Sequence, residues 1–232
     1  FLAASFGRIP GLLHEQNAVM GRANRALGRY AKAIALSFAR TAKAEAFADK
    51  SVLTGNPVRD RVRAVADTPY PAMGETVRLT VFGGSQGARV FADLVPAAIA
   101  QLPQDLRSKL RVVQQCRPED LDRVAETYRR AKVNVELAAF FDDLPERIAQ
   151  SHLVIARSGA STVAELTVIG RPAILVPLPG SIDADQKNNA LVVEAAGGGW
   201  IAEQATLSPP SLASRLASLL GEPEALQRAA AA

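Results

Sequence analysis

The stretch LTVFGGSQGA, residues 79–88, decides the fold of this chain. Its first four residues form a short run that ends at two glycines, which is typical of a buried strand followed by a turn. From residue 85 to residue 99 the apolar side chains return at helical spacing, with Val90, Leu94 and Ile99 able to share one face. The stretch therefore predicts a strand, a glycine turn and a helix in direct succession.

The same alternation continues toward the C-terminal end. Strands are predicted at residues 111–113, 133–137, 153–156, 173–176 and 200–202, and helices at residues 118–130, 144–149, 161–169, 186–196 and 209–220. Regular alternation of this kind implies an α/β fold, in which a parallel sheet is covered by helices on both faces through right-handed crossovers. Ligands of such sheets bind beyond the carboxyl ends of the strands, so we expect a site at that edge.

The residues before this array follow a less regular pattern. The apolar pair Leu12 and Leu13 ends a predicted strand, which delivers the polar sequence HEQN, residues 14–17, onto a loop. A helix and a strand are predicted at residues 21–30 and 32–38.

A domain boundary is predicted near Arg59. The sequence GNP at residues 55–57 breaks regular structure because proline restricts the residue before it. The polar stretch at residues 60–75 is typical of a linker. We therefore expect two domains, residues 1–58 and residues 59–232. The chain begins with phenylalanine rather than methionine and soon meets a dense polar motif, so we also expect a fragment that lacks an N-terminal part.

The composition is that of a soluble globular protein, with 48% hydrophobic and 22% charged residues. The net charge of +4 suits a phosphate-bearing ligand or an anionic membrane surface. It is too small and scattered to favour nucleic acid, and 5% aromatic residues are few for base stacking. The single cysteine, Cys116, excludes an internal disulfide and fits a reducing cytoplasm. A secretory signal and an apolar stretch of about 20 residues are not found.

The glycine-rich loop after the first predicted strand is the strongest local signal for a site. Gly83, Gly84 and Gly87, with Ser85 and Gln86 among them, lie between a strand and a helix. Glycines let the backbone approach an anion, and the free N–H groups of a helix start point at it. The loop therefore predicts a phosphate or diphosphate site. It matches neither the dinucleotide fingerprint nor a Walker loop, and a turn that only packs helix against strand is the alternative.

A second small-residue turn, RSGA at residues 157–160, again lies between a strand and a helix. Glu165, one turn into that helix, has the chemistry to accept hydrogen bonds from the two hydroxyls of a ribose. The spacing of Thr162 and Glu165 also fits a capping box, in which the carboxylate only reaches back to the helix start. From the residues alone, ribose binding and helix capping by Glu165 are equally favoured.

Two further polar clusters are less specific. Asp183, Asp185, Gln186 and Asn189 follow the strand at residues 173–176, and a solvated helix start is the favoured interpretation. For HEQN, four hydrogen-bonding side chains in succession favour a role in lining a site.

The remaining candidates are interpreted as structural. His152 precedes a buried strand, and Cys116 is expected to be a small buried hydrophobe. Histidines, cysteines and carboxylates are not spaced as in a metal site, so no metal and no cofactor is expected.

Six motifs in order resemble the MurG family of GT-B glycosyltransferases, within glycosyltransferase family 28. They are HEQN at 14–17, GNPVR at 55–59, GGSQGA at 83–88, FFDD at 140–143, RSGA at 157–160 with Glu165, and DQ at 185–186 with NA at 189–190. The resemblance implies two Rossmann-like domains, the N-terminal one incomplete here. It also implies inverting transfer of N-acetylglucosamine from UDP-N-acetylglucosamine to the 4-hydroxyl of the muramyl sugar of lipid I, at the cytoplasmic membrane face.

The resemblance also assigns residues of the donor site. Glu165 would hold the ribose hydroxyls, Phe141 would address the uracil through its backbone, and Arg59 would neutralise diphosphate charge. Contacts to the donor are likewise expected from the small-residue loops, namely Gly83, Gly84, Ser85, Gln86 and Gly87 at the diphosphate, and Ser158 and Gly159. Asp185 and Gln186 would meet the N-acetylglucosamine hydroxyls, although some members have glutamine or histidine in place of Asp185. Asn17 would face the sugar from the other side of the cleft.

Other functions remain open. Another UDP-sugar GT-B transferase, such as a diacylglycerol glucosyltransferase, could share the donor half, although HEQN argues against it. A UDP-N-acetylglucosamine epimerase lacks a suitable set of histidines and carboxylates here. A UDP-sugar-binding module without turnover is the third alternative. Because the general base of the family lies in a segment that precedes this chain, no catalytic base is assigned, and we expect donor binding with little transfer.

Overall fold

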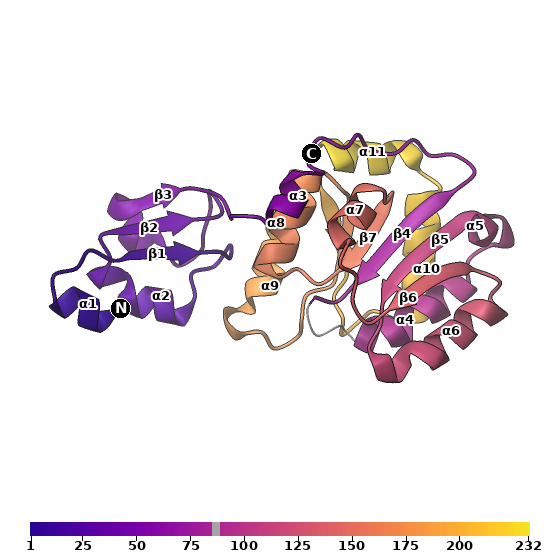
Figure 1. Cartoon of the computed structure of the whole chain (residues 1–232), viewed down its shortest axis with the longest axis horizontal. Helices are drawn as coiled ribbons and strands as arrows, with labels where there is room; N and C mark the ends of the chain where they lie inside the picture. Colours follow the sequence, from indigo (N-terminus) through magenta and orange to yellow (C-terminus); the bar gives the residue numbers. More distant parts are fainter. Residues whose placement is uncertain (85–88) are drawn as a thin grey trace.

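The computed structural model describes residues 1–84 and 89–232, and it contains two parallel sheets (Figure 1). We refer to residues 1–58 as the small region and to residues 59–232 as the large region. The sheet of the small region has the strand order β1-β2-β3. Its strands are β1 (Leu12–Glu15), β2 (Ala33–Leu36) and β3 (Ser51–Leu53), and its helical segments are α1 (Leu2–Phe6), α2 (Arg22–Leu27), η1 (Gly28–Tyr30) and η2 (Glu45–Lys50).

The sheet of the large region has six parallel strands in the order β6-β5-β4-β7-β8-β9. The strands are β4 (Val77–Phe82), β5 (Leu110–Gln115), β6 (Asn134–Ala138), β7 (Leu153–Ala156), β8 (Ala173–Leu175) and β9 (Gly199–Ile201). The chain builds outward from β4 to β6 and then returns to place β7 on the other side of β4. The strand order therefore reverses between β4 and β7, which is where such sheets bind ligands.

Helices cover both faces of the large sheet. They are α3 (Asp60–Arg63), α4 (Arg89–Ala100), α5 (Gln104–Lys109), η3 (Pro118–Asp120), α6 (Leu121–Arg130), α7 (Leu144–Ala149), α8 (Ala160–Ile169), η4 (Ile182–Ala184), α9 (Asp185–Ala196), α10 (Pro209–Leu220) and α11 (Pro223–Ala231). Among the described residues, no helix combines the length and the apolar character needed to cross a bilayer.

Alternating strand side chains build two cores, one on each face. Leu79, Val81 and Ile155 point to the face covered by α4, α6 and α10. Phe82 and Val154 point to the opposite face, which α3, α7, α8 and α9 cover. Strand β7 is buried along its whole length because it lies between helices on both faces, which explains why its sequence is a continuous apolar run.

The predicted α/β fold with a parallel sheet is confirmed. Helices α7 and α10 and strand β7 have the predicted bounds, and the other predicted strands and helices of the large region lie within a few residues of the prediction in the described part of the chain. The prediction of a linker at residues 60–75 is wrong in its first part, because α3 begins there and buries Val62 against the large sheet. Short elements were missed, namely α1, η2, β3, α5 and α11.

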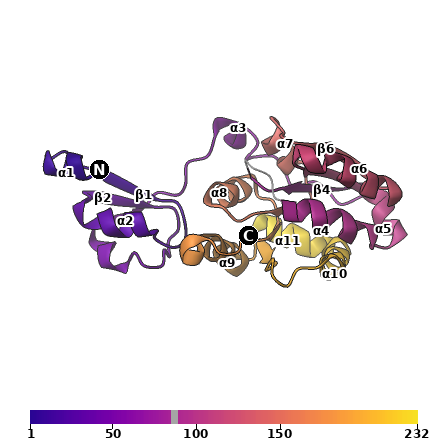
Figure 2. The ribbon, with the colours of Figure 1, turned by 90° about the horizontal axis from the view of Figure 1, so that it is seen from below.

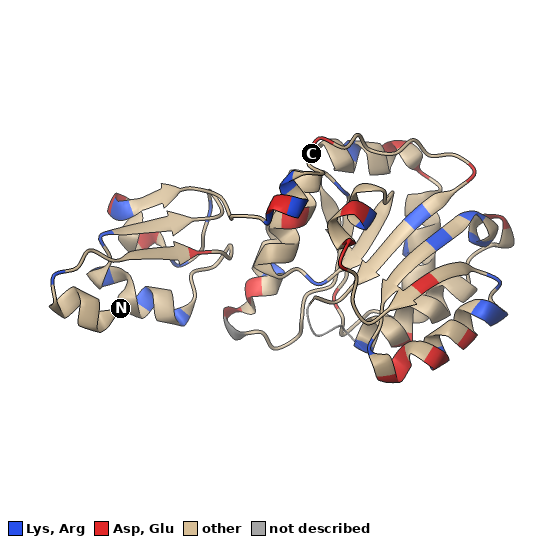
Figure 3. Ribbon diagram, viewed as in Figure 1, with Lys and Arg blue, Asp and Glu red and all other residues tan. Residues whose placement is uncertain are grey.

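The small region lies beside α8 and α9 of the large region (Figures 1 and 2). Hydrogen bonds and ion pairs join α9 and the turn before it to α2 and the loops of the small region. Charge is distributed unevenly between the two, since the small region carries eight lysines and arginines against three aspartates and glutamates (Figure 3). The large region is close to neutral, so the positive charge of the chain comes from the small region.

Candidate functional site

The loops after β4 and β7 flank the point where the strand order reverses, and both carry predicted site residues. Gly83 and Gly84 directly follow β4, and Ser158 and Gly159 follow β7. Gly84 has φ of +84°, a conformation that glycine adopts without steric cost. Ser85, Gln86 and Gly87 lie outside the described residues. The two loops that the sequence singled out are thus neighbours at the carboxyl edge of the sheet.

Gln115, which the sequence analysis did not single out, joins two of the site loops. Its side-chain oxygen accepts a hydrogen bond of 3.2 Å from the backbone N–H of Gly83, and its amide nitrogen donates one of 3.2 Å to the backbone oxygen of Ala139. The side chain is buried and ties the loop after β4 to the loop after β6. Gln114 and Gln115 directly follow the strand predicted at residues 111–113, at the edge where a site is expected, and this position was the signal that could have found Gln115.

The aromatic ring of Phe141 is packed against the protein rather than exposed. The side chain is 8% exposed, and the guanidinium of Arg147 lies 4.5 Å from the centre of the ring. Arg147 is itself held by Glu136 and Asp143, and these carboxylates raise its pKa above the ordinary value of arginine. A ligand at this loop would therefore meet the backbone of Phe141, as the resemblance implies.

Ser158 connects the loop after β7 with the start of α9. Its hydroxyl donates a hydrogen bond of 2.8 Å to the backbone oxygen of Gln186, and its own backbone oxygen accepts one of 3.0 Å from Asn189. Its neighbour Gly159 is the N-cap residue of α8 and supplies no side-chain cap. The hydroxyl of Ser158 thus joins the loop after β7 to the first turn of α9 and is already engaged. The backbone of this turn is left to contact a ligand.

Glu165 and Arg59, both predicted to bind the donor, contact each other. An Arg59 nitrogen lies 3.1 Å from a Glu165 carboxylate oxygen, and two hydrogen bonds of 3.2 and 3.3 Å join the side chains. The Glu165 side chain is 12% exposed, while that of Arg59 is 62% exposed. The capping-box interpretation of Glu165 is wrong, because its carboxylate turns to Arg59 at the start of α3 instead.

Asn17 reaches the large region from the loop after β1. The buried carboxylate of Glu15 holds this loop by accepting hydrogen bonds from the backbone N–H of Asn17 at 3.0 Å and of Gly21 at 2.9 Å. The side-chain oxygen of Asn17 accepts a hydrogen bond of 3.0 Å from Asn189, whose own oxygen accepts one of 2.8 Å from the backbone N–H of Ala18. A fully buried amide therefore bridges the two regions.

His14 remains inside the small region. Its Nε2 lies 3.2 Å from both the backbone oxygen of Gly55 and the hydroxyl of Ser37. Because Ser37 follows β2 and Gly55 follows β3, the imidazole joins the ends of all three strands. Within HEQN, it is Glu15 and Asn17 that shape the contact with the large region.

Asp185 and Gln186 form the first turn of α9. The Asp185 carboxylate accepts a hydrogen bond of 2.8 Å from the backbone N–H of Gln186, and the Gln186 side chain accepts one of 3.0 Å from the backbone N–H of Leu178. Together with Ser158, these bonds connect the loop after β8, the loop after β7 and α9. The predicted sugar-binding side chains are thus held in one hydrogen-bonded turn.

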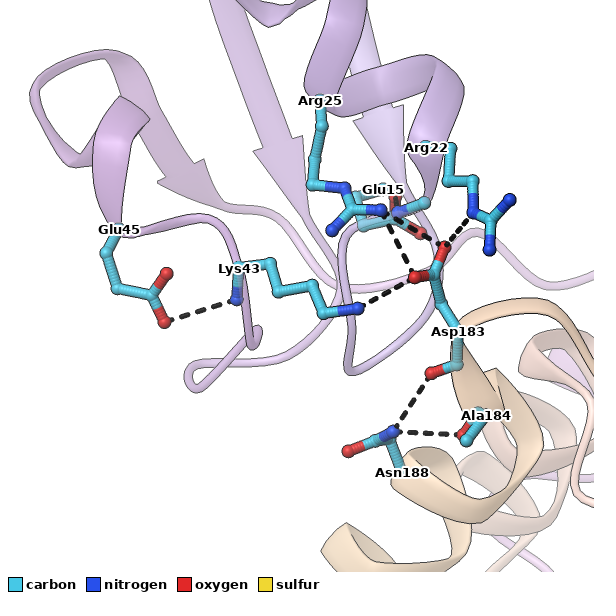
Figure 4. Close-up of polar contacts among 9 residues, drawn as sticks. Glu15, Arg22, Arg25, Lys43, Glu45, Asp183, Ala184 and Asn188 are labelled. Atoms are coloured by element: carbon cyan, nitrogen blue, oxygen red, sulfur yellow. Dashed lines mark hydrogen bonds and ion pairs between the residues drawn. The ribbon is translucent and has the colours of Figure 1, made fainter.

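The interpretation of Asp183 as part of a solvated helix start is wrong. Its side chain is 7% exposed and lies among Arg22, Arg25 and Lys43 of the small region (Figure 4). The hydrogen bond from Lys43 is the main cause that lowers the pKa of Asp183. Among the described residues, no group of three histidine, cysteine, aspartate or glutamate side chains is placed to hold a metal ion.

The model of the glycosyltransferase family 28 C-terminal domain matches residues 78–232, which contain the large sheet and all of its helices except α3. The chain belongs to glycosyltransferase family 28. The family match begins at β4 and contains all the loops at the carboxyl edge of the large sheet, so the predicted donor loops lie within the family domain.

Two relatives of this family 28 chain each match at least 99% of its length. A protein of Methylobacterium sp. (strain 4-46), named UDP-N-acetylglucosamine–N-acetylmuramyl-(pentapeptide) pyrophosphoryl-undecaprenol N-acetylglucosamine transferase, is 56% identical over 235 residues, which cover 100% of this chain and 63% of that protein. The crystal structure of Acinetobacter baumannii MurG is 31% identical with a TM-score of 0.81, covering 99% of this chain and 64% of that one. The chain thus spans just under two thirds of the length of these relatives.

A more distant likeness shows the fold alone. The UDP-GlcNAc 2-epimerase of Neisseria meningitidis is 16% identical with a TM-score of 0.65, covering 99% of this family 28 chain and 66% of that chain.

A cavity of about 600 Å³ lies between the small region, α8, α9 and the C-terminal residues of the chain. It is separate from the predicted donor site. It is lined by Phe38, Asn56, residues of α8 and α9, and the last residues of the chain. None of the predicted donor-binding residues that the structure describes lines it. Its lining is mostly apolar. Its one charged side chain, Arg171, is 4% exposed and donates its hydrogen bonds to backbone oxygens of the protein, so it is not free to bind a diphosphate.

Proposed function

We propose that this chain holds the nucleotide-sugar site of an inverting hexosyltransferase, which moves N-acetylglucosamine from UDP-N-acetylglucosamine to the 4-hydroxyl of the muramyl sugar in lipid I and so makes lipid II. The observation that carries the proposal is the hydrogen-bonded chain from Asn17 through Asn189 to Ser158. It brings the HEQN loop, the loop after β7 and α9 together across the two regions. The names of the relatives at 50–56% identity supply the substrate class.

The arrangement suits the departure of a nucleoside diphosphate. As the bond to the sugar breaks, negative charge grows on the phosphate, and prearranged N–H groups and cations stabilise that charge. We place the diphosphate at Gly83 and Gly84, which Gln115 holds in position, and the ribose at Glu165. Ribose hydroxyls would compete with Arg59 for the Glu165 carboxylate, which frees the exposed guanidinium of Arg59 to turn toward the diphosphate.

The sugar of the donor would lie at the first turn of α9. Asp185 and Gln186 are held there beside the Ser158 loop, and Asn17 approaches from the small region. This places the reacting carbon in the cleft between the two regions. The acceptor would enter from the side of the small region, whose excess of lysine and arginine suits both the diphosphate of lipid I and an anionic membrane surface.

Calorimetric titration with UDP-N-acetylglucosamine, UDP-glucose and ADP tests the proposal. We expect binding of UDP-N-acetylglucosamine in preference to the other two, and a loss of at least about tenfold in Glu165→Ala, because the variant lacks the acceptor for two ribose hydroxyls. Glu126→Ala is the matched control, since Glu126 is also bound by arginines, Arg129 and Arg130, but lies on α6 away from the cleft.

The three ligands separate the alternatives. Equal binding of UDP-glucose would favour a transferase of another UDP-sugar, and preference for ADP would contradict the assignment of the uracil site. Binding of UDP-N-acetylglucosamine that Glu165→Ala leaves unchanged would contradict the ribose site while leaving the donor class intact.

A further inference from the structure

Asp183 is surrounded by more positive charge than one carboxylate neutralises (Figure 4). One of its oxygens lies 2.7 Å from the Lys43 ammonium and 3.1 Å from an Arg25 nitrogen, and the other lies 3.8 Å from Arg22. All three cations belong to the small region, whereas Asp183 lies two residues before the start of α9 in the large region. Lys43 is 140 positions away from Asp183 in the sequence, so only the folded arrangement brings the two together.

The backbone at this point has a conformation that its residues do not favour. Asp183 has φ of +60° and Ala184 has φ of +52°, and neither residue is glycine. Residues with a side chain adopt this left-handed conformation only where the surroundings hold them there. The contacts on Asp183 are the ones that reach this turn from the small region. Asn188 adds a local contact by donating a hydrogen bond of 2.9 Å to the backbone oxygen of Ala184.

The turn leads directly into the predicted sugar-binding side chains. Asp185 and Gln186 are the next two residues, and α9 begins with them. Further along the same helix, Asn189 is held by Asn17 and Ala18. The first turn of α9 is therefore flanked by two attachments to the small region, an ionic one before the helix at Asp183 and a neutral one in its second turn at Asn189.

We propose that Asp183 is a positioning residue, through which Arg22, Arg25 and Lys43 of the small region set the first turn of α9 for the sugar part of a nucleotide-sugar donor. The inference rests on the proposed donor site and extends it. It assigns no contact between Asp183 and the ligand. Its physical content is that the sugar end of the site is complete only while the small region holds this turn, whereas the nucleotide end is built by the large region alone.

The division between sugar and nucleotide gives a specific test. Titrations with UDP and with UDP-N-acetylglucosamine are compared for the unchanged chain and for Asp183→Asn, which keeps the shape but removes the charge. We expect UDP affinity to stay within about twofold and the affinity for UDP-N-acetylglucosamine to fall about tenfold. Asp183→Glu keeps the charge and is expected to recover most of the loss.

The cations provide a reciprocal variant. Lys43→Met combined with Arg25→Met should reproduce the sugar-specific loss of Asp183→Asn, and the triple variant should lose little more, because the same interaction is already absent. Raising the salt concentration from about 0.05 M to about 0.5 M should weaken UDP-N-acetylglucosamine binding more in the unchanged chain than in Asp183→Asn. Glu126→Gln, which loses an ionic cluster within α6, is the control and should behave as the unchanged chain.

A measurement without ligand separates this inference from the proposed function. In Asp183→Asn, amide hydrogen exchange should become faster at residues 184–189 and stay unchanged in β4 and β7. If exchange in that turn does not change, or if UDP and UDP-N-acetylglucosamine lose affinity equally, Asp183 does not position the sugar end. If the unchanged chain binds neither ligand while exchange does respond, the donor proposal fails and Asp183 keeps only its part in joining the two regions.

Discussion

The two parallel sheets differ in how completely each one buries its own strands. In the large region, Leu153, Val154 and Ile155 of β7 are fully buried, with helices on both faces. In the small region, Val52 and Leu53 of β3 are 58% and 59% exposed. The large sheet therefore buries its central strand between two layers of helices, whereas β3 of the small sheet leaves apolar side chains exposed. We therefore expect a site divided between the two regions to have a more rigid half in the large region and a less rigid half in the small one.

The largest expected effect comes from equal cavities cut into the two cores. Ile155 in β7 and Ile34 in β2 are both fully buried. Ile155→Ala should lower the free energy of unfolding of the large region by about 3 kcal/mol, through lost burial and the remaining cavity. Ile34→Ala should lower that of the small region alone, and by less, because the smaller core relaxes around the cavity more easily. Urea unfolding followed by hydrogen exchange at residues of each sheet measures both.

This pair of variants also tests whether the comparison holds at all. If Ile34→Ala lowers the stability of β4 and β7 as much as that of β1 and β2, the two regions unfold as one cooperative unit. The small region would then be part of the same core and not an adjustable half of the site.

A smaller effect is expected from the buried amide between the regions. Asn189→Ala leaves the backbone N–H of Ala18 and the backbone oxygen of Ser158 without their partner. The expected cost is about 2 kcal/mol, which is typical when a buried polar group loses its hydrogen bond. The loss should appear as earlier unfolding of the small region. Asn134→Ala, which removes an exposed amide on β6, is the control and should leave the small region unchanged.

The large sheet could be predicted from the sequence because its signals are local. Runs such as residues 153–156 are apolar throughout and are bounded by polar or small residues, so period and length alone indicate a buried strand. The loops at its carboxyl edge followed from the same pattern. Elements α3 and β3 could not be predicted in this way, since α3 has four residues and β3 has three, and each is placed by contacts with distant parts of the chain.

The contacts of the site residues were much less predictable than their positions. Asp183 and Glu165 each had an ordinary helix-start interpretation, and their actual partners, Lys43 and Arg59, are more than 100 positions away. Gln115 was missed because nothing in its neighbours shows that Gly83 lies beside it. Pairings across the sequence depend on the topology of the sheet, and a local pattern does not contain that information.

The pH dependence of the large region is expected to come from His152. Its Nδ1 accepts a hydrogen bond of 2.9 Å from the backbone N–H of Arg78, and its Nε2–H donates to the backbone oxygen of Ala72 at 3.2 Å. Burial lowers the pKa of His152 below its usual value of 6.5. The unfolded chain therefore takes up a proton at a higher pH than the native one. Stability is retained above pH 6.5 and falls as the pH drops from 6.5 toward the native pKa, by at most about 1.4 kcal/mol per pH unit.

Urea unfolding of the large region between pH 7.5 and pH 5 measures this loss, with His152→Asn as the comparison. Asparagine keeps an acceptor for the Arg78 N–H and does not take up a proton, so the variant should lose less stability over the same interval. An equal slope in both proteins would assign the pH dependence to another group.

The smallest effect on stability is expected at the ion pair of Arg59 and Glu165, where the effect on ligand binding is expected to be large. The pair is open to solvent on the arginine side, so Arg59→Met should change the free energy of unfolding by less than about 1 kcal/mol. If the ribose takes the Glu165 carboxylate from Arg59, removing Arg59 has two opposite consequences for binding. The ribose site becomes free without competition, and the diphosphate loses a cation. Uridine, which has the ribose but no phosphate, should then bind Arg59→Met somewhat more tightly than the unchanged chain, whereas UDP should bind it more weakly.

Calorimetric titration with uridine and with UDP measures the effect at the ribose and the effect at the diphosphate separately. Weaker binding of both ligands would mean that Arg59 supports the shape of the site. The start of α3, where the small region joins the large one, would then belong to the large region's part of the site.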